Sequence, residues 1–260
     1  MKWTNNFDRG YGMSTFALKI TALILMVVDH VGYYFEGTPY WFRLIGRGAY
    51  PLFLFCMVWG YYYTRDRKIY LLRLYIMSLF MSFFMYTVDA RFVSAYGYGN
   101  HNVFVPMLLI GVIVSTIETF QKDRHMGYLM LTGIFLVQVL YTVLPMFIPF
   151  LRSLSGDVLT GIIPNLELNE YGSMFVILGV IMYFTKENKG LLTAVYILFC
   201  MIQFSGDLLH YGIINQCFMI IALPFMLKYN NKKGPGLKYF FYIFYPAHTF
   251  ILFYLADFGL

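Results

Sequence analysis

Charged residues are scarce in this chain of 260 residues, of which 12% are Asp, Glu, Lys or Arg and 60% are hydrophobic. A water-soluble domain carries about twice that charged fraction, so the composition argues against a soluble protein. The continuous apolar runs are about 20 residues long, which suits membrane-spanning helices, whereas strands of a membrane barrel show alternating segments of about ten residues. We therefore expect an all-α, polytopic transmembrane helix bundle.

Cysteine is also scarce, and the chain contains only Cys56, Cys200 and Cys217. They form no CxxC pair and lie in apolar segments, which predicts packing roles and neither a disulfide framework nor a metal site. The sequence has no GxSxG, no HExxH and no glycine-rich phosphate loop. A serine hydrolase, a zinc protease and a P-loop ATPase therefore have no support.

Apolar runs follow one another along the whole chain. They cover 15–35, 42–63, 69–88, 102–120, 126–150, 170–184, 190–205, 211–229 and 237–257. Because two of them are short and prolines interrupt 126–150, we expect about nine helices, with eight to ten possible. No internal repeat and no soluble appendage accompany them, which favours one domain over residues 1–260.

Basic residues alternate between the expected loops. The N-terminus and the second, fourth, sixth and eighth loops carry Lys2, Arg9, Arg65, Arg67, Lys68, Lys122, Arg124, Lys186, Lys189, Lys228, Lys232, Lys233 and Lys238, whereas the odd loops carry Arg43, Arg91 and Arg152. By the positive-inside rule the N-terminus is cytoplasmic. The net charge of +6 is thus interpreted as a topology signal of a cell-membrane protein, and no nucleic acid is expected as a partner.

Asp29 and His30 are adjacent inside the first apolar run, in "ILMVVDHVGYYF". Ionisable side chains at this depth are costly unless they face protein or water, which indicates a function. A carboxylate can orient an imidazole and raise its basicity, and the imidazole can then take a proton from a nucleophile. We interpret His30 as a general base, or alternatively a transient acyl carrier, oriented by Asp29.

Two further groups of residues lie near this pair in the expected topology. Arg43 and Arg47 are four residues apart, share a helix face, and could bind phosphate or stabilise an oxyanion. His248, in "FYPAHTF", lies in the last run and could supply a second proton-transfer group. The structural alternatives are a buried ion pair among Asp29, His30 and Arg47, and a helix-packing hydrogen bond at His248. Lone loop residues such as Asp207 are expected to be solvated.

Three segments together resemble the TraX family of integral membrane proteins. They read "LKITALILMVVDHVGYYF", "RLIGRGAYPLFLFCMVWGYYYTRDRKIYLLRL" and "FYIFYPAHTFIL". The resemblance implies a relation to transmembrane acyltransferases, which carry acyl groups from cytoplasmic acyl-CoA to acceptors across the membrane. The residues that match the family motifs are Asp29, His30, Arg43, Gly46, Arg47, Arg65, Arg67, Lys68, Arg73, Tyr245, Pro246 and His248.

The residues and the resemblance together predict a membrane-embedded acyltransferase that uses acetyl-CoA as the donor. The acceptor would be an amine or hydroxyl group on a peptide N-terminus or a surface glycan. We assign catalysis to His30, Asp29 and His248. We assign binding of the acetyl-CoA donor to Arg43, Arg47, Arg65, Arg67, Arg73 and Tyr245. The alternatives are a transporter or flippase, which would also need buried ionisable residues, and a non-catalytic membrane assembly factor.

Overall fold

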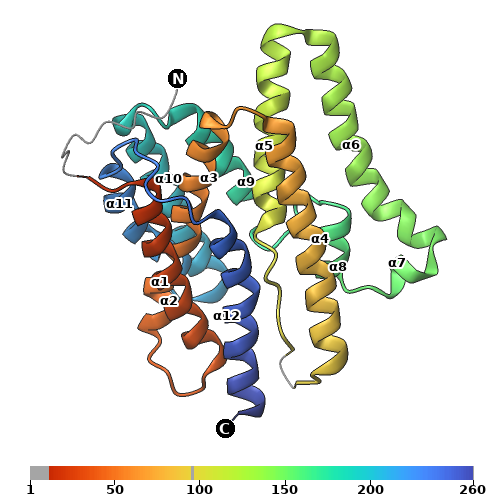
Figure 1. Ribbon diagram of the computed structural model, residues 1–260, viewed down its shortest axis with the longest axis vertical. Helices are drawn as coiled ribbons and strands as arrows, with labels where there is room; N and C mark the ends of the chain where they lie inside the picture. Colours follow the sequence, from red (N-terminus) through yellow and green to blue (C-terminus); the bar gives the residue numbers. More distant parts are fainter. Residues whose placement is uncertain (1–11, 95–96, 260) are drawn as a thin grey trace. The chain divides into compact units, whose positions relative to one another are not determined.

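The computed structural model describes residues 12–94 and 97–259, and the regular structure within these ranges is helical (Figure 1). An isolated bridge between Met13 and Tyr229 is the extended pairing found there. The predicted all-α architecture is confirmed. Lys2 and Arg9, used in the charge count, lie outside the described residues.

The chain divides into two compact units. Unit 1 is formed by the chain up to Tyr63 and from Ile181 onwards, and unit 2 by Thr64–Val180. The helices of unit 1 are α1 (Thr15–Tyr34), α2 (Trp41–Gly46), α3 (Ala49–Tyr63), α10 (Lys189–Tyr211), η1 (Gln216–Ala222), α11 (Leu223–Leu227) and α12 (Lys238–Phe258). Those of unit 2 are α4 (Arg67–Arg91), α5 (Phe104–Lys122), α6 (Arg124–Phe147), α7 (Pro149–Ser153) and α8 (Gly156–Ile162). Helix α9 (Gly172–Thr185) crosses the boundary between them.

Six helices in the described ranges, α1, α4, α5, α6, α10 and α12, are long and apolar enough to cross a membrane. The remaining expected spans are shorter or broken. The run 42–63 divides into α2 and α3, 170–184 forms the 14-residue α9, and 211–229 forms η1 followed by α11. Pro224 lies at the start of α11, where its missing N–H is tolerated but ends the preceding turn.

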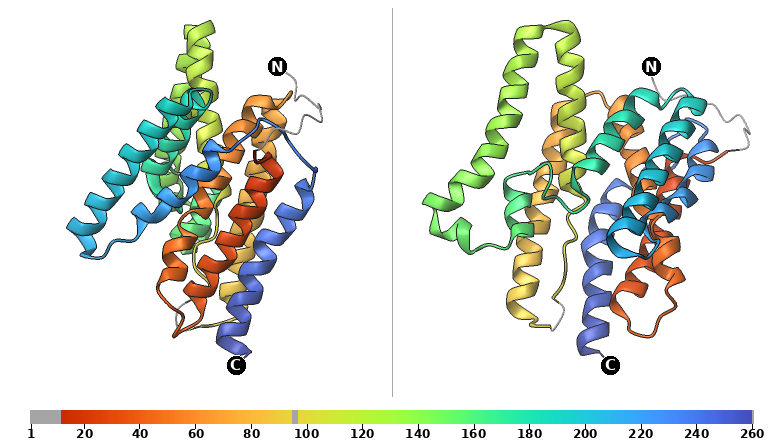
Figure 2. Two further views of the ribbon diagram at one scale, coloured as in Figure 1. Left: turned by 90° about the vertical axis from the view of Figure 1, so that its left-hand side faces the viewer. Right: turned by 180° about the vertical axis from the view of Figure 1, so that it is seen from behind.

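Helix α1 packs against α2, α3 and α12 within unit 1. Ser14 caps its first turn by accepting a hydrogen bond from the backbone N–H of Ala17 at 3.2 Å. Leu18, Ala22 and Met26 are buried and follow one another at four-residue spacing, so one stripe of α1 faces the core. Figure 2 shows α1 and α12 side by side.

One end of unit 1 collects basic segments that are far apart in the sequence. The backbone N–H of Met13 donates to the carbonyl of Lys228 at 2.7 Å, and that of Thr15 to the carbonyl of Lys232 at 2.8 Å. The ammonium of Lys189 donates to the carbonyl of Leu227 at 2.8 Å. The start of α1, the α9–α10 turn and the loop after α11 therefore share one end, as the charge count predicts for these three segments.

Helices α4, α5 and α8 form the packed part of unit 2. The buried Asn102 side chain donates to the carbonyl of Ser78 at 3.0 Å and to the hydroxyl of Ser82 at 3.2 Å. Gly161 of α8 lies directly against Ser82, where any larger residue would clash with the hydroxyl. Polar contacts between close-packed small residues thus hold these helices together, as is common in membrane helix bundles.

Candidate functional site

A pair of histidines joins α1 to α12. The Nδ1 atom of His30 lies 2.8 Å from Nε2 of His248, and Nδ1 of His248 lies 2.9 Å from the carbonyl oxygen of Phe244. Because a carbonyl oxygen only accepts, Nδ1 of His248 carries the proton, and Nε2 of the neutral ring is an acceptor. Nδ1 of His30 is then the donor in the pair, which leaves the lone pair of a neutral His30 on Nε2.

Aromatic neighbours hold the His248 ring in this orientation. The ring stacks on Phe244 at a centroid distance of 4.9 Å, and Tyr245 meets it edge-on at 5.8 Å. His248 and Tyr245 are both buried. Tyr245, predicted to bind the donor, therefore lies against His248 as a packing neighbour.

Asp29 faces α2, where it forms an ion pair with Arg43. The Nη1 atom of Arg43 lies 2.9 Å from Oδ2 of Asp29 and donates to its backbone carbonyl at 3.1 Å. Consecutive residues on an α-helix point about 100° apart, so Asp29 and His30 face different neighbours. Among the described residues, Asp29 pairs with arginine and not with the His30 ring. The prediction that Asp29 orients His30 is corrected, because His248 does so.

Two glycines let α1 and α2 approach closely enough for this ion pair. A Cβ atom on Gly46 would lie 2.2 Å from Cβ of Asp29, and one on Gly32 would lie 2.8 Å from Cβ of Phe42. No side chain fits at such distances without moving a helix. Gly46, between Arg43 and Arg47 in "RLIGR", thus explains why the two arginines lie beside Asp29.

Arg47 is held by a chain of polar contacts that the sequence alone does not indicate. Its Nε donates to Oδ1 of Asn215 at 3.0 Å. Oδ2 of the buried Asp207 accepts from the backbone N–H groups of Asn215 and Gln216, at 2.8 and 2.6 Å. Asp207, expected to be solvated, therefore fixes the start of η1 and with it the Asn215 side chain.

The arrangement leaves polar atoms available inside the site. The Nη groups of Arg47 have no acceptor among the described residues, and Oδ1 of Asp29 is buried there without a hydrogen-bond partner. Arg47 is close enough to Asp29 to interact with its charge. Two guanidinium groups beside one carboxylate leave a net positive site that suits an anionic or developing negative oxygen.

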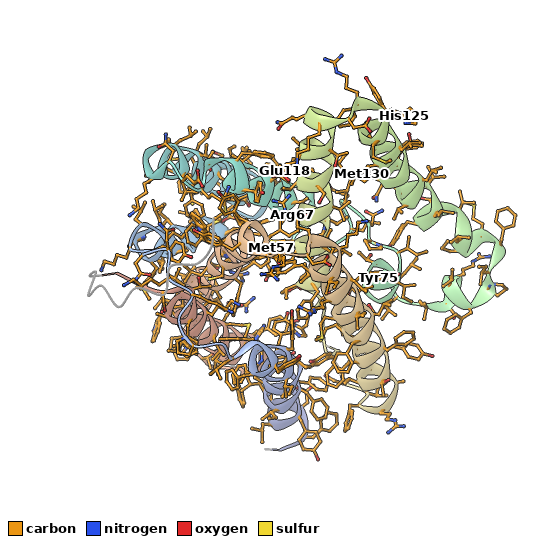
Figure 3. All side chains as sticks on the ribbon, turned by 45° about the horizontal axis from the view of Figure 1, so that its top comes forward. Met57, Arg67, Tyr75, Glu118, His125 and Met130 are labelled. Atoms are coloured by element: carbon orange, nitrogen blue, oxygen red, sulfur yellow. The ribbon has the colours of Figure 1, made fainter. Side chains whose placement is uncertain are left out.

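The other residues predicted to bind the acetyl-CoA donor, Arg65, Arg67 and Arg73, belong to unit 2. Arg67 forms an ion pair with Glu118 of α5 (Figure 3), while Arg65 and Arg73 are exposed. The positive charge of Arg67 is therefore partly neutralised by the Glu118 carboxylate. In the part of the chain that the structure describes, no group of three His, Cys, Asp or Glu side chains could hold a metal ion.

The fold and site define a class of protein, a multi-pass helical membrane protein with a histidine pair and an arginine–carboxylate cluster among its helices. More than two thirds of the sequence matches the model of a single protein family. The chain belongs to the TraX family, whose model, described as TraX protein, matches residues 14–256. The family predicted from the three sequence segments is confirmed.

Curated relatives cover the chain to different extents. It is 44% identical over 52 residues to Protein TraX of Escherichia coli, 20% of each chain, and 38% identical over 72 residues to Protein TraX of strain K12, 26% of this chain and 28% of that one. These matches thus span less than a third of either relative. It is 22% identical over 260 residues to "Probable fimbrial assembly protein FimC, serogroup H1" of Dichelobacter nodosus, 94% of this chain and 96% of that one. No solved structure matches.

Proposed function

We propose that this protein is a membrane-embedded acyltransferase of the bacterial cell membrane that transfers an acetyl group from acetyl-CoA to an amine or hydroxyl acceptor. The observation that carries the proposal is the hydrogen bond between Nδ1 of His30 and Nε2 of His248. It fixes the tautomer in which Nε2 of His30 is the basic atom. A general base within a membrane bundle has little use in a purely structural protein.

In this reaction the acceptor nitrogen or oxygen attacks the thioester carbonyl while Nε2 of His30 takes the acceptor's proton. The imidazolium formed donates through Nδ1 to Nε2 of His248, whose own Nδ1–H stays on the carbonyl of Phe244. As the carbon–sulfur bond breaks, His30 returns the proton to the leaving thiolate. The products are the acetylated acceptor and free CoA.

Arg47 is the residue best suited to the negative charge that develops on the carbonyl oxygen. Its Nε is bound to Asn215, so the guanidinium is oriented while its Nη groups remain available as donors. Arg43 is bound to Asp29 and positions α2. The same proton transfer serves an amine and a hydroxyl nucleophile, so the proposal covers a peptide N-terminus and a surface glycan as acceptors.

Mass spectrometry of surface peptides and glycans tests the proposal in cells. Cells lacking the gene should lose an acetyl group that returns with the wild-type gene and with His125→Gln, which changes an exposed histidine at the start of α6. His30→Gln at equal membrane abundance should fail to restore it. An unchanged acetylation pattern in the deleted strain would contradict the proposal.

A second candidate function is a non-catalytic assembly factor, favoured by the similarity to the fimbrial assembly relative along nearly the whole chain. In that case the histidine pair serves helix packing. The two functions differ in one result, since an assembly factor with His30→Gln retains its phenotype whenever the protein is present at wild-type abundance.

A further inference from the structure

A second site lies at the basic end of unit 1. A cavity of about 340 Å³ lies between α3, the α9–α10 turn and α11 with the residues after it. Small-molecule pockets have volumes of roughly 300–1,000 Å³. The start of α1 borders the same region, because the hydroxyl of Thr15 lies 3.1 Å from that of Tyr229, a lining residue.

Aromatic side chains form much of the cavity wall. Trp59 stacks on Tyr63 at 5.5 Å with an interplanar angle of 19°, and its ring lies 5.2 Å from that of Tyr229. Tyr229 is a neutral phenol at physiological pH, as any tyrosine of ordinary pKa is, and burial raises its pKa further. Flat, rigid aromatic walls of this kind suit a planar ring.

The Trp59 indole brings an unsatisfied donor to this wall. The residue is only 5% exposed, and its Nε1–H has no acceptor among the described residues. Leaving a buried donor unpaired costs about 1–3 kcal/mol. An acceptor atom of a ligand in the cavity would remove that cost.

Two lysines supply positive charge. The Lys189 ammonium donates one N–H to the carbonyl of Leu227, and its other two N–H groups have no acceptor in the described part of the chain. The ammonium of Lys186 lies 4.0 Å from the Tyr62 ring centroid and 4.2 Å from that of Tyr183. Glu187 also lines the cavity but accepts a hydrogen bond from the Tyr62 hydroxyl. The lining thus keeps a net positive charge beside its aromatic wall.

We propose that this cavity binds a nucleotide-containing ligand, with a phosphate on Lys189 and a ring against Trp59 and Tyr63. If the proposed acyltransferase function holds, the ligand is the acyl-CoA donor, and this identification rests on that function. Thr15 and His30 are both on α1 and fifteen residues apart, about 22 Å along the helix. A ligand held in the cavity therefore needs an extended arm to bring a reactive group to His30.

Calorimetric titration of the purified, detergent-solubilised protein with ADP tests the proposal. We expect saturable binding that Lys189→Gln weakens about tenfold, the loss of one charge-assisted hydrogen bond. Trp59→Phe, which keeps a flat ring but removes the N–H, should weaken it several-fold. Lys122→Gln removes the same charge from the exposed end of α5 and should leave the affinity unchanged.

Three outcomes overturn the proposal. The first is that ADP does not bind, and the second is that the wild type and both cavity variants bind ADP with equal affinity. The third is that phosphatidylglycerol occupies the cavity in a manner that depends on Lys189 and excludes ADP, which would make the cavity a lipid site. A parallel titration with CoA separates this inference from the proposed function. CoA binding that depends on Lys189 without any acetyl transfer would defeat only the acyltransferase, whereas transfer whose KM for acetyl-CoA is unaffected by Lys189→Gln would defeat only the cavity assignment.

Discussion

The imidazole rings of His30 and His248 share one hydrogen bond of 2.8 Å, although 218 positions separate them in the sequence. The bond closes unit 1 by joining α1, near the start of the described chain, to α12 near its end. One histidine orients the other, and the carbonyl of Phe244 fixes the polarity of the pair. The same contact thus serves stability and, in the proposed reaction, proton transfer.

Removing either member of the histidine pair should destabilise the protein by about 1–3 kcal/mol, because the other ring is left with an unsatisfied polar atom. Thermal unfolding of His30→Gln, His248→Gln and the double variant in detergent measures the coupling. The sum of the stability losses in the two single variants should exceed the loss in the double variant by about 0.5–3 kcal/mol, as expected for groups in direct contact. Additive effects would show that the rings do not interact.

Replacing Gly46 by alanine should separate α1 from α2. The added Cβ would lie 2.2 Å from Cβ of Asp29, and overpacking of this kind costs about 1–3 kcal/mol. We expect a lower unfolding temperature and loss of acetyl transfer. Gly133→Ala on α6 is the matched control, since its Cβ would have no neighbour within 4 Å. The control should be neutral or slightly stabilising.

Arg47 and Asn215 should differ in how strongly they affect turnover. Arg47→Gln removes the proposed oxyanion donor and should lower kcat about 100-fold or more. Asn215→Ala leaves Arg47 in place but unanchored, and should lower kcat about tenfold with little change in KM, since it acts through orientation. Gln121→Ala at the exposed end of α5 provides the control. Equal kcat values in the wild type and Arg47→Gln would reassign Arg47 to packing.

The sequence identifies Asp29, His30, Arg43, Arg47 and His248 because ionisable side chains stand out inside apolar runs. The all-α class and most helix positions follow from the same runs, since length and hydropathy decide membrane insertion. The breaks in 42–63 and 211–229 are harder to predict, because apolar composition continues across them.

The pairing of these residues depends on tertiary contacts that no local pattern encodes. Asp29 and His30 are adjacent in sequence, yet their side chains diverge around the helix and meet Arg43 and His248 respectively. Asn215 is a neutral residue in a loop, so only its position beside Arg47 reveals a role. Asp207 is likewise distinguished by its backbone partners and not by its surroundings in the sequence.

Asp157 of α8 should make the stability of unit 2 depend on pH. Partial desolvation raises the pKa of this surface carboxyl, the hydrogen bond from Asn100 at 2.8 Å offsets part of the effect, and the charge of Asp89 adds to it. The folded state therefore holds the proton more tightly than the unfolded state, whose pKa is about 3.9. The stabilisation is present below that value and is lost as the pH rises through the folded pKa.

Asp157→Asn retains an oxygen acceptor for Asn100 but removes the charge. It should raise the unfolding temperature at pH 7, and the difference from the wild type should shrink as the pH falls to about 4. Unfolding curves at both pH values check this. A variant that is less stable at pH 7 would show that the ionised carboxylate is favoured in the fold.

The release of CoA thiol from acetyl-CoA by the purified protein, in the presence of an amine or hydroxyl acceptor, tests the central proposal most directly. The wild type and His125→Gln should turn over, whereas His30→Gln, folded and inserted as judged by its unfolding curve, should lose at least about 100-fold in kcat, because an amide cannot accept the acceptor's proton. Turnover by His30→Gln at the wild-type rate would contradict the assignment of His30 as the base.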